Sequence, residues 1–402
     1  MEDRDHRKIG QELDLFTFSD LVGSGLPLWT PRGTIVRNEL DAYVWTLRNR
    51  YNYHRVTIPH LTKRDLYDKS GHWEKFAEDL FRITSREGRE YAVKPMNCPH
   101  HTQIFARRPH SYREMPQRYA ETTMVYRDEQ SGELGGLTRV LSITQDDSHV
   151  FCRQSQIKEE FFKIWDVVDT FYKTFGFDLR VRLSFRDPNE PGKYLGTPAI
   201  WDGAEGALRD LAKERNADYF EGPGEAALYG PKLDFMAKNA VGKEWQVATI
   251  QLDMNLPDRF DLTCVNEKGE KERIVMIHSA ITGSLERCIA VLLEHYDGAL
   301  PTWLSPVQAR VIPIADAHHA FAKEALEQLI AAGIRAELDD SNETLGKKIR
   351  GAKTEKVPYT LVIGDAEVAA KTATLEGRAG KVGALSIEEI VSKLKEEISN
   401  RA

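Results

Sequence analysis

Side chains able to bind a charged ligand gather on one face of a predicted strand. Because side chains in a strand alternate faces with a period of two, residues 139–151 place on one face Arg139, Ile143, Gln145, Asp147 and His149. In the strand before it, Arg127 and Glu129 share a face in the same way. Burying so many charges is costly unless they meet a ligand or one another. A solvated outer face of alternating polar residues is the alternative that the pattern leaves open.

A thiol and two imidazoles could hold a metal ion. Cys98 shares its strand parity with Lys94 and Met96, and His278 ends an apolar strand. Together with His149 they are the ligand types that zinc prefers. The three positions are 51 and 129 residues apart, which matches no short metal-binding motif. Cys98 as a small buried side chain and His278 as the end of a strand therefore remain alternative interpretations.

One arginine is placed where phosphate could bind. Gly283 and Ser284 precede an apolar helix, so that Arg287 falls in its first turn. The N-terminus of a helix favours anions because its N–H groups are unpaired and its dipole is positive there.

These residues depend on a scaffold of strands and separated helices. Apolar spacing of three and four residues predicts helices over residues 35–50, 155–175 and 284–296. Alternating or apolar runs predict strands over residues 55–58, 119–126, 139–151, 179–185, 242–253 and 272–278. Runs of strands with separated helices indicate an α+β fold, in which helices cover one side of an antiparallel sheet.

The chain is expected to divide near Pro301. Pro301 and Pro306 enclose a segment that favours extended backbone, as at a link between domains. Beyond it, predicted strands over residues 307–314, 334–338, 359–363 and 371–374 alternate with helices over residues 320–332, 346–354 and 387–398. This alternation is typical of βαβ units. We therefore expect a first domain over residues 1–300 and a smaller α/β domain over residues 301–402.

Composition and charge exclude several classes of protein. The 402 residues are 41% hydrophobic and 29% charged, which is typical of a globular enzyme and not of a disordered or collagen-like chain. No run approaches the ~20 apolar residues of a membrane span, and four scattered cysteines predict a reducing compartment, here the cytoplasm. The net charge of −7 argues against a protein that coats DNA. A basic cluster with Lys347, Lys348 and Arg350 could still contact RNA.

Taken in chain order, three segments resemble the motifs of class II aminoacyl-tRNA synthetases: the helix and strand ending at Pro59, Arg127-Asp128-Glu129, and Gly283 to Arg287. Within that class, residues 94–98, 144–149 and 276–278 are similar to segments of threonyl-tRNA synthetases. The resemblance covers nearly the whole chain. It implies a class II antiparallel sheet flanked by helices, followed by a smaller α/β anticodon-binding domain, without the N-terminal editing region.

The resemblance implies a threonine–tRNA ligase, which forms threonyl-adenylate from L-threonine and ATP and transfers the threonyl group to tRNA(Thr). It implies one Zn²⁺ per subunit, held by Cys98, His149 and His278, with open positions for the amino and hydroxyl groups of threonine. Valine is then rejected because a methyl group cannot coordinate the metal, whereas an apolar pocket separates such pairs only ~10²-fold. The implied amino-acid site comprises Met96, Gln145, Asp147, Tyr229, Gln246 and Gln251.

The family also implies an ATP site that contains Arg127, Glu129, Arg139, Ile143 and Arg287. Arg127 would bind the α-phosphate and Arg287 the γ-phosphate, Glu129 would contact adenine, and Mg²⁺ would accompany ATP. Lys232 and His72 would assist catalysis, although a histidine on the surface is an open interpretation of His72. We expect a homodimer through residues 34–59, and tRNA contacts from Lys347, Lys348, Arg350 and Glu367.

Several positions qualify this assignment. Gln246 and Gln251 differ in strand parity, so both face the site only across a bulge, and Gln251 is the weaker candidate.

Ile143 departs from the family pattern, because it stands where an aromatic ring usually stacks on adenine. His100 stands where many members have glycine, and could crowd the metal or compete as a ligand. Ser279 replaces a common arginine, and residues 375–377 lack the arginine-rich strand that reads the anticodon in bacterial members.

These departures keep two alternatives open. One is a synthetase-like paralogue that binds RNA or a partner without charging tRNA, and the other is a class II relative specific for proline or serine. Because no editing domain precedes the predicted catalytic domain, we also expect detectable mischarging with serine. One missing methyl group is worth only ~1–3 kcal/mol.

Overall fold

The computed structural model describes residues 4–240 and 242–401, which form two compact units. One unit contains residues 18–27 and 41–288. The other contains the described residues up to 17, residues 28–40 and those from 289 onward. Among the described residues, no helix combines the length and the apolar character that crossing a membrane requires.

The first unit is built on an eight-stranded sheet with the order β10-β9-β11-β12-β15-β8-β7-β3. Its strands are β3 (His54–Arg55), β7 (Gln117–Tyr126), β8 (Ser142–Cys152), β9 (Leu179–Phe185), β10 (Tyr219–Pro223), β11 (Lys232–Lys238), β12 (Glu244–Asp253) and β15 (Val275–Ala280). Neighbouring strands are antiparallel except for the pairs β10–β9 and β3–β7. The predicted α+β fold with an antiparallel sheet is confirmed.

Smaller elements surround this sheet. A three-stranded sheet has the order β4-β6-β5, and β13 pairs with β14. These strands are β4 (Leu61–Lys63), β5 (Arg82–Thr84), β6 (Glu90–Val93), β13 (Thr263–Val265) and β14 (Lys271–Arg273). The helices of this unit are α3 (Arg64–Ser70), α4 (His72–Lys75), α5 (Cys98–Ala106), α6 (Ile157–Thr174), α7 (Pro198–Glu214) and α8 (Asn255–Arg259), and both α2 (Pro31–Asn49) and α9 (Leu285–Tyr296) contribute residues to each unit.

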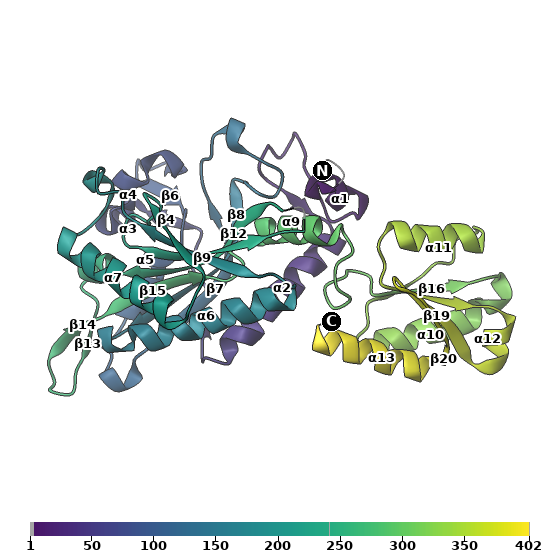
Figure 1. The fold of residues 1–402 in the computed structure, drawn as a ribbon. Coiled ribbons are helices and arrows are strands. Elements are labelled where there is room, and N and C mark those ends of the chain that lie inside the picture. Colours follow the sequence, from purple (N-terminus) through teal and green to yellow (C-terminus); the bar gives the residue numbers. More distant parts are fainter. Residues whose placement is uncertain (1–3, 241, 402) are drawn as a thin grey trace. The chain divides into compact units, whose positions relative to one another are not determined.

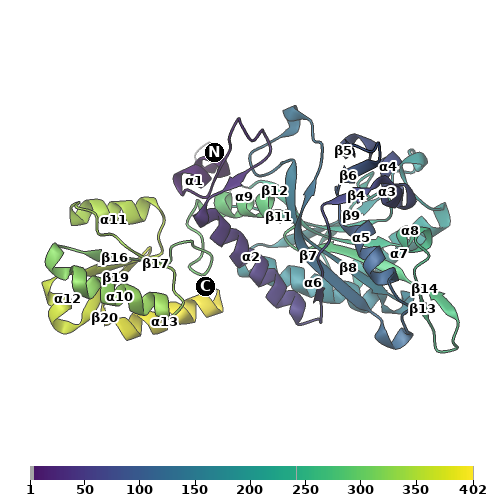
Figure 2. The same ribbon diagram turned by 180° about the vertical axis from the view of Figure 1, so that it is seen from behind.

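Two long helices pack directly on the sheet. α6 lies against β12 and β15, and α7 lies against β9. Trp165 of α6 meets Phe235 of β11 edge to face, with ring centroids 5.2 Å apart. α6 also runs beside α2 in both views (Figures 1 and 2), where Tyr43 stacks on Phe171 at 5.4 Å. The apolar spacing correctly predicted α2, α6 and α9, whereas α7 was not predicted.

Three segments differ from the sequence-based expectation. β8 begins at Ser142, so Arg139 lies in the loop before it. Cys98 begins α5 instead of continuing a strand, because Pro99 is suited to the first helical turn. The strand predicted over residues 55–58 is reduced to β3 at the edge of the sheet.

The second unit contains a five-stranded sheet with the order β17-β16-β18-β19-β20. Its elements are β16 (Ala309–Pro313), α10 (His319–Ala331), β17 (Ala336–Leu338), α11 (Leu345–Thr354), β18 (Tyr359–Ile363), α12 (Asp365–Ala370), β19 (Thr372–Gly377), β20 (Gly380–Ser386) and α13 (Ile387–Asn400). α10 and α13 cover one face and α11 the other (Figure 1). This arrangement confirms the predicted α/β domain. The same unit also contains α1 (His6–Glu12) and the pair β1 (Phe16–Thr17) and β2 (Leu28–Trp29).

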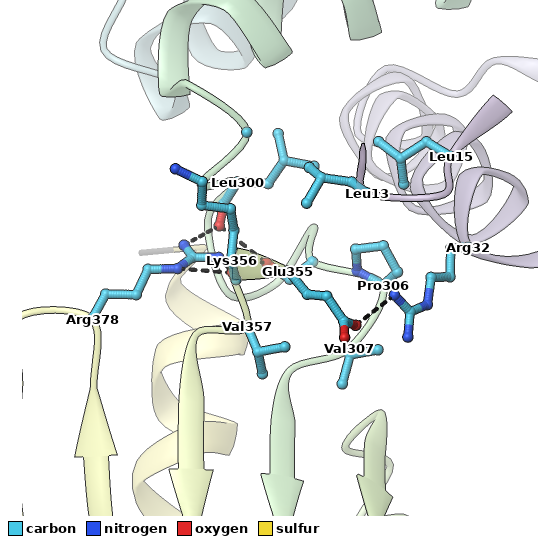
Figure 3. Close-up of a pocket in the computed structure, with 12 residues that line it drawn as sticks. Leu13, Leu15, Arg32, Leu300, Pro306, Val307, Glu355, Lys356, Val357 and Arg378 are labelled. Atoms are coloured by element: carbon cyan, nitrogen blue, oxygen red, sulfur yellow. Dashed lines mark hydrogen bonds and ion pairs between the residues drawn. The ribbon is translucent and has the colours of Figure 1, made fainter. Parts of the chain in front are cut away.

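The segment between Pro301 and Pro306 is packed and not exposed. Arg335 donates from Nη2 to the carbonyl oxygen of Trp303 at 2.6 Å, and Arg378 donates from Nη1 to that of Leu300 at 2.5 Å. The cavity beside this segment has a volume of about 20 Å³ (Figure 3). That is room for about one water molecule, so it excludes a nucleotide. The division at residues 300 and 301 stays a prediction.

A buried carboxylate joins α2, β8 and the turn after β15. Asp146 is inaccessible to solvent, and Arg48 of α2 donates from Nη2 to its Oδ2 at 3.0 Å. Ile281 donates its backbone N–H to Oδ2 at 2.8 Å, and Thr282 donates its N–H and hydroxyl to Oδ1 at 2.9 and 2.7 Å. Three segments far apart in the chain therefore meet at one charge.

Removing the arginine should destabilise this unit strongly. Arg48→Met leaves the Asp146 carboxylate buried without its counter-ion, which typically costs about 3–5 kcal/mol. Urea unfolding followed by tryptophan fluorescence measures the loss. The matched control is Lys158→Met, which breaks the exposed pair with Glu214 and should change the unfolding free energy very little. Equal stability of the two variants would contradict the role given to Asp146.

Candidate active site and metal centre

The fold brings together three residues that are distant in sequence. The ligand atoms of Cys98, His149 and His278 lie within 4.8 Å of one another, and all three side chains are buried. Strand register explains the two imidazoles, because His149 of β8 lies directly opposite His278 of β15. Cys98 is delivered by the first residue of α5. The donor set that the sequence suggested is therefore assembled in the described part of the chain.

Hydrogen bonds orient the two imidazoles. Nε2 of His278 lies 2.9 Å from Oδ2 of Asp253, and Nδ1 of His149 lies 2.8 Å from Nδ1 of His101. A carboxylate accepts, so Nε2 of His278 carries the hydrogen and its Nδ1 presents a lone pair. With the hydrogen of His149 on Nδ1, its Nε2 also presents a lone pair, 3.1 Å from Nδ1 of His278.

In this tautomer two lone pairs face each other, and that favours a cation between them. Burial lowers the pKa of His149, and the charge of His278 lowers it further, so the ring is neutral and able to coordinate. Burial raises the pKa of the Cys98 thiol, and a bound cation opposes that effect because it stabilises the thiolate. One thiolate and two imidazoles with outer hydrogen bonds fit a zinc ion that keeps an open position.

His100 is kept out of the ligand group. It is 7% exposed and lies edge-on to Tyr67, with ring centroids 6.3 Å apart. Burial lowers its pKa to about 4, and the charge of Lys94 adds to this. Among the described residues, the group that could hold a metal contains Cys98, His149 and His278 without it. The structure therefore does not support His100 as a competing ligand.

Polar side chains adjoin the candidate metal ligands. Tyr229 stacks on His278 with ring centroids 4.6 Å apart, and its hydroxyl donates to Oε1 of Gln251 at 2.5 Å. Gln251 lies opposite His278 in the β12–β15 register. On the other side of the imidazoles, Oδ1 of Asp147 lies 3.9 Å from Nε2 of His149. Asn97 donates from Nδ2 to Oδ2 of the same aspartate at 2.9 Å. Acceptor oxygens thus stand on both sides of the imidazoles.

The two glutamines of β12 face the same side. The β11–β12 register shifts between Phe235 and Met236, opposite Val247, and this bulge reverses the parity of Gln246. Both ends of the Gln246 amide are engaged, since Nε2 donates to Asp234 at 3.0 Å and Oε1 accepts from Arg182 at 2.8 Å. Gln251 is the glutamine that lies beside the candidate metal ligands. The sequence made Gln251 the weaker candidate for the amino-acid site, and the structure makes it the stronger one.

The remaining residues of the predicted amino-acid and catalytic set lie on the same side of the sheet. Lys232 pairs with Gln251 in register and lies 3.3 Å from Asp234. Gln145 lies opposite Thr123, and Met96 packs on the apolar cluster that contains Cys98.

His72 is completely buried, so the surface interpretation of this residue is wrong. Its Nδ1 lies 2.7 Å from the hydroxyl oxygen of Ser70, and its Nε2 has no hydrogen-bond partner among the described residues. Burial lowers its pKa to about 3, with smaller contributions from nearby cations including His278 and Arg127. The ring is therefore neutral with one free nitrogen, and its part in catalysis stays a prediction.

At the other end of the face, two guanidinium groups lie close enough for their charges to act on a third. Burial lowers the pKa of Arg287, and the charges of Arg127 and Arg139 lower it further. Arg139 donates to Oε2 of Glu129 from Nε at 2.8 Å and is also paired with Glu133. Gly283 turns the chain into α9 with a φ of +67°, and a Cβ there would lie 3.2 Å from the carbonyl oxygen of Val247. Repelling cations of this kind suit a polyphosphate.

The second unit uses two of the predicted RNA-contacting residues internally. Lys348 is 5% exposed and donates from Nζ to the carbonyl oxygens of Pro313 and Asp339 at 3.3 and 3.0 Å. Glu367 accepts from the N–H of Gly364 and the hydroxyl of Thr374 at 3.0 and 2.8 Å, which lowers its pKa. Lys347 and Arg350 are exposed and stay predictions as RNA contacts.

The sequence-based reasoning did not identify four supporting residues. Asp253 and His101 orient the imidazoles, Asp234 holds Gln246, and Asp146 joins three segments. A signal existed for Asp253, which shares strand parity with Gln251. None existed for Asp146 or Asp234, because their partners are distant in sequence.

Comparisons with known proteins identify the relatives of this chain. Residues 81–296 match the model of the tRNA synthetase class II core domain (G, H, P, S and T), and residues 308–397 match the anticodon binding domain. The chain is 46% identical to the threonine–tRNA ligases of Synechocystis sp. over 405 residues and of Listeria monocytogenes over 401 residues. Both alignments cover 99% of this chain, and 67% and 63% of those proteins, so the chain spans about two thirds of their length.

A solved structure is similar over nearly its full length. The RNA binding domain of threonyl-tRNA synthetase from Cryptosporidium parvum superposes with a TM-score of 0.93 and 37% sequence identity. The alignment covers 98% of each chain.

The arginine cluster should bind inorganic pyrophosphate. Arg287→Gln removes one of three cations, and a hydrogen bond to a charged group is worth about 1.5–3 kcal/mol. Isothermal titration calorimetry should therefore show pyrophosphate binding about tenfold weaker or more. The control is Arg209→Gln, which removes a guanidinium paired with Glu221 outside the cluster. Unchanged affinity in Arg287→Gln, or an equal loss in the control, would refute a polyphosphate site here.

Proposed function

The chain belongs to the threonyl-tRNA synthetases, a family of class II aminoacyl-tRNA synthetases, and on this premise we propose that it joins L-threonine to tRNA(Thr). In the first step a carboxylate oxygen of threonine attacks the α-phosphorus of ATP, and pyrophosphate leaves. In the second step a terminal ribose hydroxyl of tRNA attacks the carbonyl carbon, and AMP leaves. The enzyme forms no covalent bond, so its contribution is positioning and charge stabilisation.

Arginines hold the nucleotide in this proposal. Arg127 binds the α-phosphate and Arg287 the γ-phosphate, and Mg²⁺ accompanies ATP. Arg139 holds Glu129 in place for adenine through the hydrogen bond at 2.8 Å. Support comes from the burial of Arg287 and from the charges of Arg127 and Arg139, which together lower its pKa.

Threonine is selected beside Cys98, His149 and His278. A zinc ion bound by these residues would supply a Lewis acid that accepts an amino group and a hydroxyl but not a methyl group. Asp147 accepts the hydrogen of the threonine hydroxyl, and Tyr229 and Gln251 line the opposite side. The observation that carries the proposal is the pair of imidazole nitrogens that face each other at 3.1 Å, with their outer nitrogens bonded to Asp253 and His101.

Further parts of the proposal concern assembly and tRNA. Two copies associate through residues 34–59, which is supported by β3 being the edge strand of the large sheet with exposed His54 and Arg55. The catalytic domain extends over residues 1–300 and the anticodon-binding domain over residues 301–402. The two matched family ranges support this division.

ATP–pyrophosphate exchange tests the function. With threonine, serine, valine and proline offered separately, threonine should give the fastest exchange, serine a slower one and valine almost none. Removing zinc with a chelator should abolish exchange, and adding Zn²⁺ back should restore it. A paralogue that does not charge tRNA would give no exchange with any amino acid, and a prolyl enzyme would prefer proline. Either outcome refutes the proposal.

A further inference from the structure

A buried lysine lies near the residues proposed to bind the amino acid and has no part in the function proposed above. Lys94 follows β6 and has no exposed surface. Its backbone is held on both sides, because its N–H donates to the carbonyl oxygen of His60 at 2.8 Å and its carbonyl oxygen accepts from Tyr126 at 2.9 Å. Its ammonium donates to the hydroxyl of Thr123 on β7 at 3.0 Å. The charge is therefore fixed against the sheet.

Two carboxylates face each other on the strands beside this ammonium. Glu121 of β7 lies directly opposite Asp147 of β8, and in the next rung Thr123 lies opposite Gln145. Directly opposed side chains have Cβ atoms about 4.5–5.5 Å apart, and like charges at that distance destabilise a sheet. Oε1 of Glu121 accepts from the N–H of Ile58 at 3.3 Å, and its buried Oε2 has no hydrogen-bond partner among the described residues.

Electrostatic effects connect the lysine with both carboxylates. Burial lowers the pKa of Lys94, and the charges of Glu121 and Asp147 oppose that change. Burial raises the pKa of Glu121, and the charge of Lys94 opposes it. The charges of both carboxylates thus act on one ammonium, and of the two carboxylates Asp147 is the one that borders the candidate metal site, 3.9 Å from Nε2 of His149.

We propose that Lys94 is a positioning residue for recognition of the β-hydroxy amino acid, because its ammonium balances Glu121 and keeps Asp147 directed at the substrate hydroxyl. Without the ammonium, Glu121 repels Asp147 away from its hydrogen bond with Asn97. Without the Glu121 charge, Lys94 is drawn to Asp147 and competes with the substrate for its oxygens. The inference rests on the proposed threonine activation.

A double-mutant cycle on the full chain tests this balance. Lys94→Met and Glu121→Gln should each raise the threonine KM about tenfold in ATP–pyrophosphate exchange, as expected for loss of a charge-assisted contact. The ATP KM should change less than about twofold, since the arginine cluster is untouched. The combined variant should have a threonine KM closer to that of the parent than either single variant, because it removes both charges together.

The matched control is Lys163→Met, which removes another ammonium bonded to a buried glutamate, Glu160, at 2.8 Å on α6. It should leave both KM values unchanged. If Lys94→Met does not fold, Glu121→Gln and the combined variant still decide the question. An unchanged threonine KM, an equal rise for ATP, or a combined variant no better than the single variants would overturn the inference. Absence of threonine exchange in the parent would instead refute the proposed function.

Discussion

Two imidazole nitrogens held 3.1 Å apart constrain the rest of this molecule. Their approach depends on the register of β8 against β15, and each ring is turned by a partner on its outer nitrogen, Asp253 or His101. When both facing nitrogens carry lone pairs they repel at that distance, and a positive charge between them relieves the repulsion. The hydrogen bonds to Asp253 and His101 therefore suit the two rings to holding a cation.

The face of the large sheet separates two kinds of charge. Acceptor oxygens of Asp147 and Gln251 lie beside the proposed metal ligands, and at the other end the charge of Arg127 acts on the guanidinium group of Arg287. A molecule with an amino group and a hydroxyl at one end, joined to a phosphate, matches this polarity. Most side chains of this face are fixed charges and hydrogen-bonding groups, and few are reactive groups. This is expected where catalysis consists of positioning and charge stabilisation.

Much of the site could be predicted from strand periodicity, because a period of two assigns Gln145, Asp147 and His149 to one face without knowledge of the fold. The bulge opposite Val247 could not be located, because it depends on the pairing of β12 with β11. The start of helix α5 at Cys98 was not predicted, because residues 94–98 alternate as they would in a strand. Lys348 looked like a free cation in a basic cluster, but carbonyl oxygens distant in sequence surround its ammonium.

The central claim is that one thiolate and two imidazoles hold a zinc ion with an open position. X-ray absorption at the zinc edge of the purified protein tests it most directly. The account predicts one sulfur at about 2.3 Å and two nitrogens at about 2.0–2.1 Å, with lighter atoms completing the shell. A shell of four sulfurs, a shell of oxygens alone, or protein that retains no zinc would contradict it.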